Sequence, residues 1–242
     1  MNGLFITFEG TEGSGKSTQI DILAQRLHEL GYVVRKFREP GGTPIGEEVR
    51  HTLKHSDANH GMMAETELLL MNASRAQLVR EVIRPALAGG AIVLCDRFYD
   101  STLVYQGYGR GLDLGMVMNI IDCAVEKTRP DLTLLLLVPV KVSEARRKSR
   151  LLPGLETVRD RMEEEDRGFF ERVETGYQHL AAQEPDRVRS IDATVCQQEV
   201  SREIWVLVEP LVSKLPSPAN PAVDIAAASA ILSIPKKKKL SF

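Results

Sequence analysis

The sequence predicts an α/β fold in which a five-stranded parallel sheet is covered by helices on both faces. Apolar runs expected as strands occur at Leu4–Phe8, Tyr32–Phe37, Ala91–Cys95, Leu132–Val138 and Val188–Ile191. These runs are continuous rather than alternating, which is typical of strands buried on both faces of a parallel sheet. A chain of 242 residues with 43% hydrophobic residues suits one such domain.

Helical periodicity separates the apolar runs, with helices expected at 16–30, 44–55, 64–88, 113–127, 141–150, 157–183 and 197–213. We place the domain at 1–214, because Pro216, Pro218 and Pro221 disfavour a helix beyond it. Residues 215–242 are expected to be a linker and a mobile tail. The run Lys236–Lys239 could contact nucleic acid or an acidic surface, but we favour solvated charge.

Composition narrows the possible partners. The net charge of −2 gives no global field that would favour nucleic acid or an anionic membrane. Cys95, Cys123 and Cys196 are widely spaced, which predicts neither a disulfide framework nor a zinc site and suits a reducing cytosol. No stretch has the pattern of a membrane span or a signal peptide. We therefore expect a cytoplasmic protein without nucleic-acid or membrane partners.

A glycine-rich stretch follows the first apolar run and precedes a helical pattern, reading Gly10-Thr11-Glu12-Gly13-Ser14-Gly15-Lys16-Ser17. It fits the G-x-x-x-x-G-K-[ST] phosphate loop, whose backbone N–H groups surround an anion at a helix N-terminus. Lys16 would reach the β- and γ-phosphates, and the Ser17 hydroxyl would join a magnesium shell. A glycine-rich turn that matches by chance is the alternative, which the strand–loop–helix context disfavours. The sequence therefore predicts binding of a nucleoside triphosphate.

Two further stretches follow predicted strands. Arg38–Thr43 contains Pro40 and paired glycines, so it forms a tight turn that a ligand could approach closely, although alone it would be read as an ordinary loop. Asp96 and Arg97 follow the third run; the carboxylate can orient a magnesium shell and the guanidinium can clamp a phosphate. The alternative for this pair is a salt bridge at a strand end. The guanine-reading N-K-x-D pattern and D-x-x-G are absent, which argues against a GTPase.

Two groups of side chains suit a planar base and a transferring phosphate. Met71 and Arg75 share a helical face and offer an apolar contact with a forked donor, while hydroxyl, ring and amide groups come from Ser101, Thr102, Tyr105 and Gln106. Arg146, Arg147 and Arg150 precede the Pro153-Gly154 pair, so we expect an arginine-bearing lid at about 146–156. A solvated helix face is the alternative for these arginines.

Together these stretches resemble the bacterial type of thymidylate kinase, a nucleoside-monophosphate kinase family of P-loop proteins. The resemblance runs from about Phe5 to Leu211 and is carried by Phe8–Thr18, Arg38–Thr43, Ser74–Val79, Asp96–Gly111, Asp160–Val173 and Ile191–Thr194. It implies a three-layer P-loop fold with a short lid, the reaction ATP + dTMP → ADP + dTDP with Mg²⁺, and a homodimer. The alternatives are a kinase of another monophosphate, such as dUMP or dCMP, and a non-catalytic ATP-binding protein.

The resemblance also assigns residues to roles. ATP binding falls on Gly10, Thr11, Glu12, Gly13, Ser14, Gly15, Lys16, Ser17, Thr18, Asp192 and Thr194. Binding of dTMP falls on Glu9, Glu39, Pro40, Arg50, Met71, Arg75, Arg97, Ser101, Thr102, Tyr105 and Gln106. Catalysis falls on Lys16, Arg97, Arg146, Arg147 and Arg150, and the metal on Ser17 and Asp96.

Within the implied dTMP site, Arg97 holds the phosphate, helped by Arg50, and Arg75 reads the thymine edge with Thr102 and Gln106. Tyr105 is implied to pack near the sugar and to disfavour a 2′-hydroxyl, while Glu9 and Glu12 lie near the metal or the sugar. The family usually carries a phenylalanine, stacked on thymine, at the position of Met71. A thioether contacts a ring face with less rigid geometry.

Overall fold

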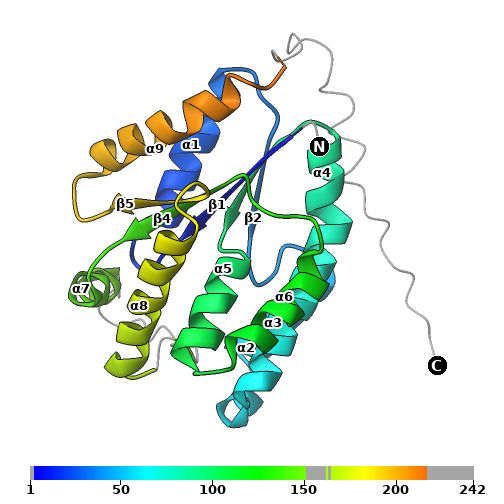
Figure 1. Ribbon diagram of the computed structural model, residues 1–242, viewed down its shortest axis with the longest axis vertical. Coiled ribbons are helices and arrows are strands. Elements are labelled where there is room, and N and C mark those ends of the chain that lie inside the picture. The colour runs from blue at the N-terminus through cyan, green and yellow to red at the C-terminus, as the bar shows by residue number, and fades with distance from the viewer. Residues whose placement is uncertain (1–2, 151–161, 163–164, 217–242) are drawn as a thin grey trace, which may run out of the picture.

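The computed structural model in Figure 1 describes residues 3–150, 162 and 165–216, with only the backbone described at 147–150. All strands run parallel in one sheet of order β2-β3-β1-β4-β5. The strands are β1 (Leu4–Glu9), β2 (Val34–Arg38), β3 (Ile92–Asp96), β4 (Leu132–Leu137) and β5 (Val188–Asp192). The predicted fold class, with all five strands near their expected positions, is confirmed.

Helices connect the strands. They are α1 (Lys16–Glu29), α2 (Pro44–Lys54), α3 (Ala64–Leu78), α4 (Arg84–Ala88), α5 (Tyr99–Thr102), α6 (Leu114–Val125), α7 (Val140–Arg150), α8 (Arg167–Gln183) and α9 (Gln197–Val212). A short 3₁₀-helix, η1, spans Asp57–Gly61, and two π-helical turns occur at η2 (Val79–Ile83) and η3 (Leu103–Gly109). None of the helices in the described part of the chain has both the length and the apolar character needed to cross a membrane.

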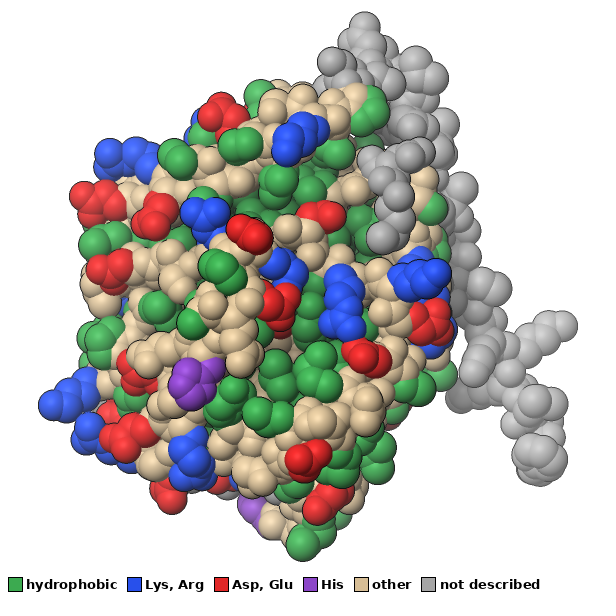
Figure 2. All heavy atoms as spheres, in the orientation of Figure 1, with side chains coloured by type: hydrophobic (Ala, Val, Ile, Leu, Met, Phe, Trp, Pro, Cys, Tyr) green, Lys and Arg blue, Asp and Glu red, His purple; other side chains and the backbone are tan. Residues whose placement is uncertain are grey.

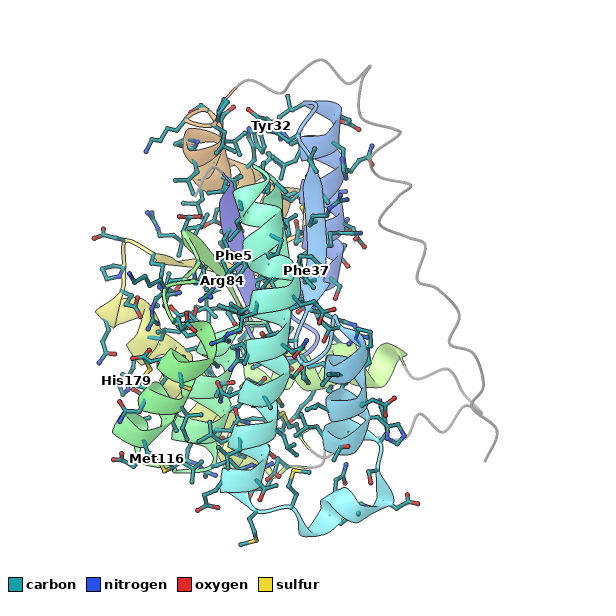
Figure 3. The ribbon with its side chains drawn as sticks, turned by 90° about the vertical axis from the view of Figure 1, so that its right-hand side faces the viewer. Phe5, Tyr32, Phe37, Arg84, Met116 and His179 are labelled. Atoms are coloured by element: carbon teal, nitrogen blue, oxygen red, sulfur yellow. The ribbon has the colours of Figure 1, made fainter. Side chains whose placement is uncertain are left out.

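The sheet separates two hydrophobic layers, because successive strand side chains point to opposite faces. Ile6 and Phe8 pack in the cluster with α1 and α9, whereas Phe5 packs in the cluster with α3 and α6. Figure 1 shows these two pairs of helices on either side of the sheet. Figure 3 views the second layer, where Phe5 and Phe37 lie beside the long helical run formed by α3, η2 and α4. A third cluster joins η3 and β4 to α8.

The structure differs from the sequence expectation in three segments. The helix expected at 64–88 is helical throughout but passes through the π-helical turn η2, just before Pro85. The helix expected at 157–183 begins at Arg167 in the described residues, and most of 157–164 lies outside them. The segment 99–109, for which no helix was expected, is helical as α5 and η3. Its glycines weaken a helical pattern, and packing of Val104 and Tyr105 against α8 compensates.

The parallel arrangement fixes where a ligand can bind. All carboxyl ends of the strands lie at one edge of the sheet, so Glu9, Arg38 and Asp96 come together there. From β1 the chain crosses to β2 on one side and later returns to β4 on the other, which opens a crevice at this edge. The segments predicted to carry chemistry begin at this edge.

Candidate active site

The loop between β1 and α1 has the backbone of an anion-binding turn. Gly10 and Gly15 adopt φ values of 128° and 97°, which residues with a side chain rarely adopt. A Cβ at Gly10 would lie 2.3 Å from the carbonyl oxygen of Leu136, so only glycine fits there. The Lys16 Nζ donates to the carbonyl oxygens of Gly10 and Thr11, at 3.1 and 3.0 Å, and so lies folded over the loop.

The ammonium group of Lys16 is buried in this loop. Burial, followed by the positive charge of Arg97, lowers the pKa of Lys16 to about 7, although Asp96, Glu9 and Glu12 oppose the shift. An anion placed beside Nζ would restore the ordinary preference for the charged form. The loop is therefore electrostatically poised to bind phosphate.

Ser17 and Asp96 meet across the crevice. The Ser17 hydroxyl donates to Asp96 Oδ2 at 2.8 Å, because β1 and β3 are neighbours and Phe8 is paired with Asp96. The two side chains present a hydroxyl oxygen and a carboxylate oxygen next to the phosphate loop. Within the described residues, no group of three or more His, Cys, Asp and Glu side chains forms a ready-made metal site.

Arg97 turns out of β3 with a φ of 67°, a left-handed conformation that is uncommon for a residue with a side chain. Its N–H donates to the Phe8 carbonyl at 3.0 Å, which fixes the turn. The partly buried guanidinium donates from Nη1 to Ser101 Oγ at 3.0 Å and lies 5.0 Å from the centre of the Tyr105 ring. It is held by neutral groups and remains available to an anion.

Glu9, at the end of β1, orders the segment after Arg97. Its Oε1 accepts from the Phe98 N–H at 2.8 Å, and its Oε2 accepts from Ser101 Oγ and the Tyr177 hydroxyl at 2.5 and 2.9 Å. Burial, followed by the nearby charge of Asp100, raises the pKa of this fully enclosed carboxyl. Through these hydrogen bonds Glu9 links the end of β1 to α5 and α8.

Two adjoining pockets open at this edge of the sheet. The first, here called the loop pocket, is lined by Glu12, Gly13, Gly15, Lys16, Ser17, Thr18, Arg38, Glu39, Arg50, Lys54, Asp96 and Arg97. The second, here called the inner pocket, is lined by Glu12, Glu39, Pro40, Lys54, Met71, Arg75, Arg97, Phe98, Ser101, Thr102, Tyr105, Gln106, Met162 and Phe170. Arg97 lines both, so Lys16 and Arg97 face one continuous crevice.

Arg75 forms the polar floor of the inner pocket and is only 2% exposed. It contacts Glu39 Oε2 from both Nε and Nη2, at 2.8 and 2.7 Å, and donates to Asn72 Oδ1 and Thr102 Oγ1, each at 2.8 Å. Burial, which Arg75 only partly offsets, raises the pKa of Glu39 to about 7. The buried Oε1 of Glu39 has no hydrogen-bond partner within the described residues.

Most predicted base-site residues thus converge, but other predicted residues lie elsewhere. Arg50 lines the loop pocket and donates to the Pro40 carbonyl at 2.9 Å. Arg146 donates to the carbonyl oxygens of Ala193 and Gly13, at 2.9 and 3.4 Å, and so joins the phosphate loop to the loop after β5. In that loop, Thr194 donates to Asp192 Oδ1 from both its N–H and its hydroxyl.

The lid predicted at 146–156 cannot be followed along its length, because 151–156 and the side chains of Arg147 and Arg150 lie outside the described residues. Sequence reasoning missed further residues of the site. Lys54, Phe98, Met162 and Phe170 line the inner pocket, and Tyr177 supports it from below. Tyr177 occupies the apolar face of α8, where its sequence spacing indicates a core residue rather than a site residue.

Comparison with known proteins identifies the family. Residues 8–204 match the family model described as thymidylate kinase. The chain belongs to the thymidylate kinase family. It is 50% identical over 202 residues to the thymidylate kinase of Syntrophotalea carbinolica, a match that covers 84% of this chain and 93% of the relative. It is 51% identical over 190 residues to that of Geobacter sulfurreducens, which covers 78% and 89%.

A solved structure supports the same assignment. The crystal structure of thymidylate kinase from Ehrlichia chaffeensis superimposes with a TM-score of 0.66 at 32% sequence identity, covering 86% of this chain and 99% of that chain. The family resemblance and the fold expected from the sequence motifs are therefore confirmed. Members of this family are nucleoside monophosphate kinases, so the chain is a phosphotransferase that uses ATP.

Proposed function

We infer that this chain transfers the γ-phosphoryl group of ATP to dTMP, giving ADP and dTDP for dTTP synthesis. The observation that carries the inference is the shared crevice of Lys16 and Arg97, which provides two facing anion sites in adjoining pockets. One pocket has a phosphate loop and suits the triphosphate. The other combines an apolar wall with buried polar groups and suits a nucleoside monophosphate.

The chemistry of the inner pocket favours an acceptor base with a carbonyl edge. Arg75 carries five N–H donors, and its contacts with Glu39, Asn72 and Thr102 leave one Nη1 hydrogen for a ligand. We propose that this hydrogen binds the O4 carbonyl of thymine, while Met71 contacts the ring face. Tyr105, wedged beside Arg97, lies where we propose that the sugar binds.

Positioning and charge neutralisation carry the reaction. The attacking phosphate oxygen of dTMP is already ionised, so no strong general base is required. We propose that Arg97, with Arg50, holds the acceptor phosphate and that Lys16 holds the triphosphate. The arginines of α7, among them Arg146, would supply further positive charge to the transferring group.

Magnesium is the metal that the site suits. Ser17 and Asp96 offer two adjacent oxygen ligands, and Mg²⁺ bound to a nucleotide needs only one or two protein ligands besides phosphate and water. We propose that these two residues hold it. A bound Mg²⁺ would neutralise charge on the phosphate oxygens.

The test is a coupled ADP-release assay with dTMP, dUMP, dCMP, AMP and GMP as acceptors. We expect the highest kcat/KM with dTMP. A higher value with dCMP or AMP would establish a different monophosphate kinase. Binding of ATP without ADP release in the presence of any acceptor would establish a non-catalytic protein.

We further propose that residues 1–214 form the catalytic domain and that the chain acts as a cytoplasmic homodimer without nucleic-acid or membrane partners. All three cysteines are free thiols, in keeping with a reducing compartment. On the face shown in Figure 2, acidic and basic side chains are interspersed rather than gathered by sign, which does not favour a polyanion. Light scattering on the purified chain tests the dimer.

A further inference from the structure

The carboxamide of Gln106 is fixed at one end. Its Nε2 donates to Glu67 Oε1 at 2.7 Å, and the Gln106 side chain lines the inner pocket. A carboxylate can only accept hydrogen bonds, so the NH₂ end of the amide must face Glu67. The amide oxygen is therefore the atom that Gln106 offers to a ligand, and within the described residues no donor occupies it.

Glu67 is itself held rigidly. It lies on α3, at 1% exposure, on the same helical face as Met71 and Arg75 at positions i+4 and i+8. Arg110 donates to both of its oxygens, from Nε at 3.2 Å and from Nη2 at 2.9 Å. A forked arginine on a carboxylate is among the strongest hydrogen-bonded pairs and fixes the carboxylate plane. The orientation of the Gln106 amide is thus imposed from behind the pocket.

The ion pair of Arg110 and Glu67, here called the clamp, also joins the inner pocket to the start of α8. Arg110 pairs with Glu165 through Nη1 and lies 5.0 Å from the centre of the Phe169 ring. Glu165 follows shortly after Met162, and Met162 lines the inner pocket. Elements from three parts of the chain therefore meet at Arg110 and secure Glu67.

We propose that Glu67 is a positioning residue that sets base specificity by holding the Gln106 amide oxygen toward the bound base. The proposal rests on the function inferred above. Thymine presents an N3–H donor beside its O4 acceptor, which matches an amide oxygen beside the remaining Arg75 donor. Cytosine presents a lone pair at N3 and an amino group at C4. The Gln106 amide oxygen would then face another acceptor, and the Arg75 N–H would face another donor, so neither hydrogen bond could form.

The test compares kcat/KM for dTMP and dCMP in the wild type and in E67Q. The substituted amide can turn either end toward Gln106, so the Gln106 amide is no longer held in one orientation. We expect the dTMP-to-dCMP ratio to fall about tenfold or more, the scale of one hydrogen bond to a charged group. A purely structural contribution would lower both values together and leave the ratio unchanged, which would overturn the proposal.

Matched variants complete the design. E65Q makes the same chemical change at an exposed position of α3 and should leave the ratio unchanged. The swap E67Q/Q106E moves the carboxylate to η3, where one oxygen accepts from α3 and the other faces the base, and should restore the dTMP preference. R110K, which loosens the clamp but keeps Glu67, should lower the ratio in the same direction, and provides the test if E67Q does not fold. A failure of the proposed function would appear as no dTMP turnover in the wild type, whereas a failure of this inference would appear as an unchanged ratio in both E67Q and R110K.

Discussion

Replacing Arg97 by alanine is the sharpest test of the shared crevice. The guanidinium lies between the two pockets, and its polar contacts are the Ser101 hydroxyl at 3.0 Å and the Tyr177 hydroxyl at 3.5 Å. Within the described residues, no carboxylate lies within salt-bridge distance of it. The substitution therefore removes a cation that is available to phosphate and leaves no buried carboxylate unpaired.

The expected magnitude follows from this geometry. One unit charge at about 4 Å from a phosphate contributes about 4 kcal/mol at an effective dielectric constant near 20. Arg97 is only partly buried, so solvent screening reduces that value toward about 3 kcal/mol. Because each 1.36 kcal/mol corresponds to a factor of ten in rate, we expect kcat/KM for dTMP to fall by about 10² to 10³.

The assay is initial-rate ADP release with dTMP varied at saturating ATP. R97K keeps the charge but loses the fork, and should lie between the wild type and R97A. R202A, at an exposed position of α9, is the control and should retain normal turnover. Thermal unfolding of each variant separates loss of activity from loss of fold. Near-normal kcat/KM in folded R97A would refute the role of Arg97 and, with it, the facing anion sites.

Four further predictions concern the phosphate loop, the wall of the inner pocket that meets the base, and the domain boundary. K16A should lose about two or more orders of magnitude in kcat/KM, as for other phosphate clamps. Since the pKa of Lys16 is about 7 without ligand and a phosphate must raise it, ATP binding at pH 8 should take up protons, and affinity should weaken as the pH rises above 7. Calorimetry in buffers of different ionisation enthalpy measures the number of protons taken up on ATP binding. If K16R takes up the same number, the protons bind to a group other than Lys16, and Glu39 is the neighbouring group to examine. M71F should tighten dTMP binding in a direct titration, because an aromatic ring stacks on the base; unchanged or weaker affinity would show that this face does not meet the base. If 1–214 is the catalytic domain, truncation after Lys214 should leave kcat/KM for dTMP within about twofold of the value for the full-length chain, because changes remote from a site usually have small effects. A larger loss in a truncated chain that still folds would contradict that boundary.

Local patterns were sufficient for the sheet and the phosphate loop. The apolar runs of β1, β3 and β4 predicted the three central strands, because a strand buried on both faces needs mostly apolar side chains. The edge strands β2 and β5 also carry exposed polar residues, and their apolar positions were still sufficient to predict them. The loop was predictable because its function depends on consecutive backbone groups, with Gly10 and Gly15 where positive φ is required and Lys16 at the start of α1. The family motifs then assigned most residues of the inner pocket.

The segment 99–109 shows that local sequence patterns do not predict every helix of this fold. Its sequence carries glycines within the helical turn, and no helix was expected there, yet α8 and β4 hold it as α5 and η3. Asp100 illustrates the reason, because its carboxylate pairs with Arg187 at 2.7 Å and accepts from Thr133 at 3.0 Å, both distant in the chain. Contacts of this kind outweigh local helix propensity.

By itself, the sequence determined the fold class, the position of the phosphate loop and the types of side chain available for two anions and a base. Only the tertiary structure decided how those side chains are oriented: Glu9 accepts hydrogen bonds from Phe98, Ser101 and Tyr177, and Gln106 donates to Glu67. The physical reason is range. The conformation of the strands and of the phosphate loop is indicated by residue types close together in the sequence, whereas the direction of a buried polar group is set by the partners that must satisfy its hydrogen bonds, and these arrive from distant segments.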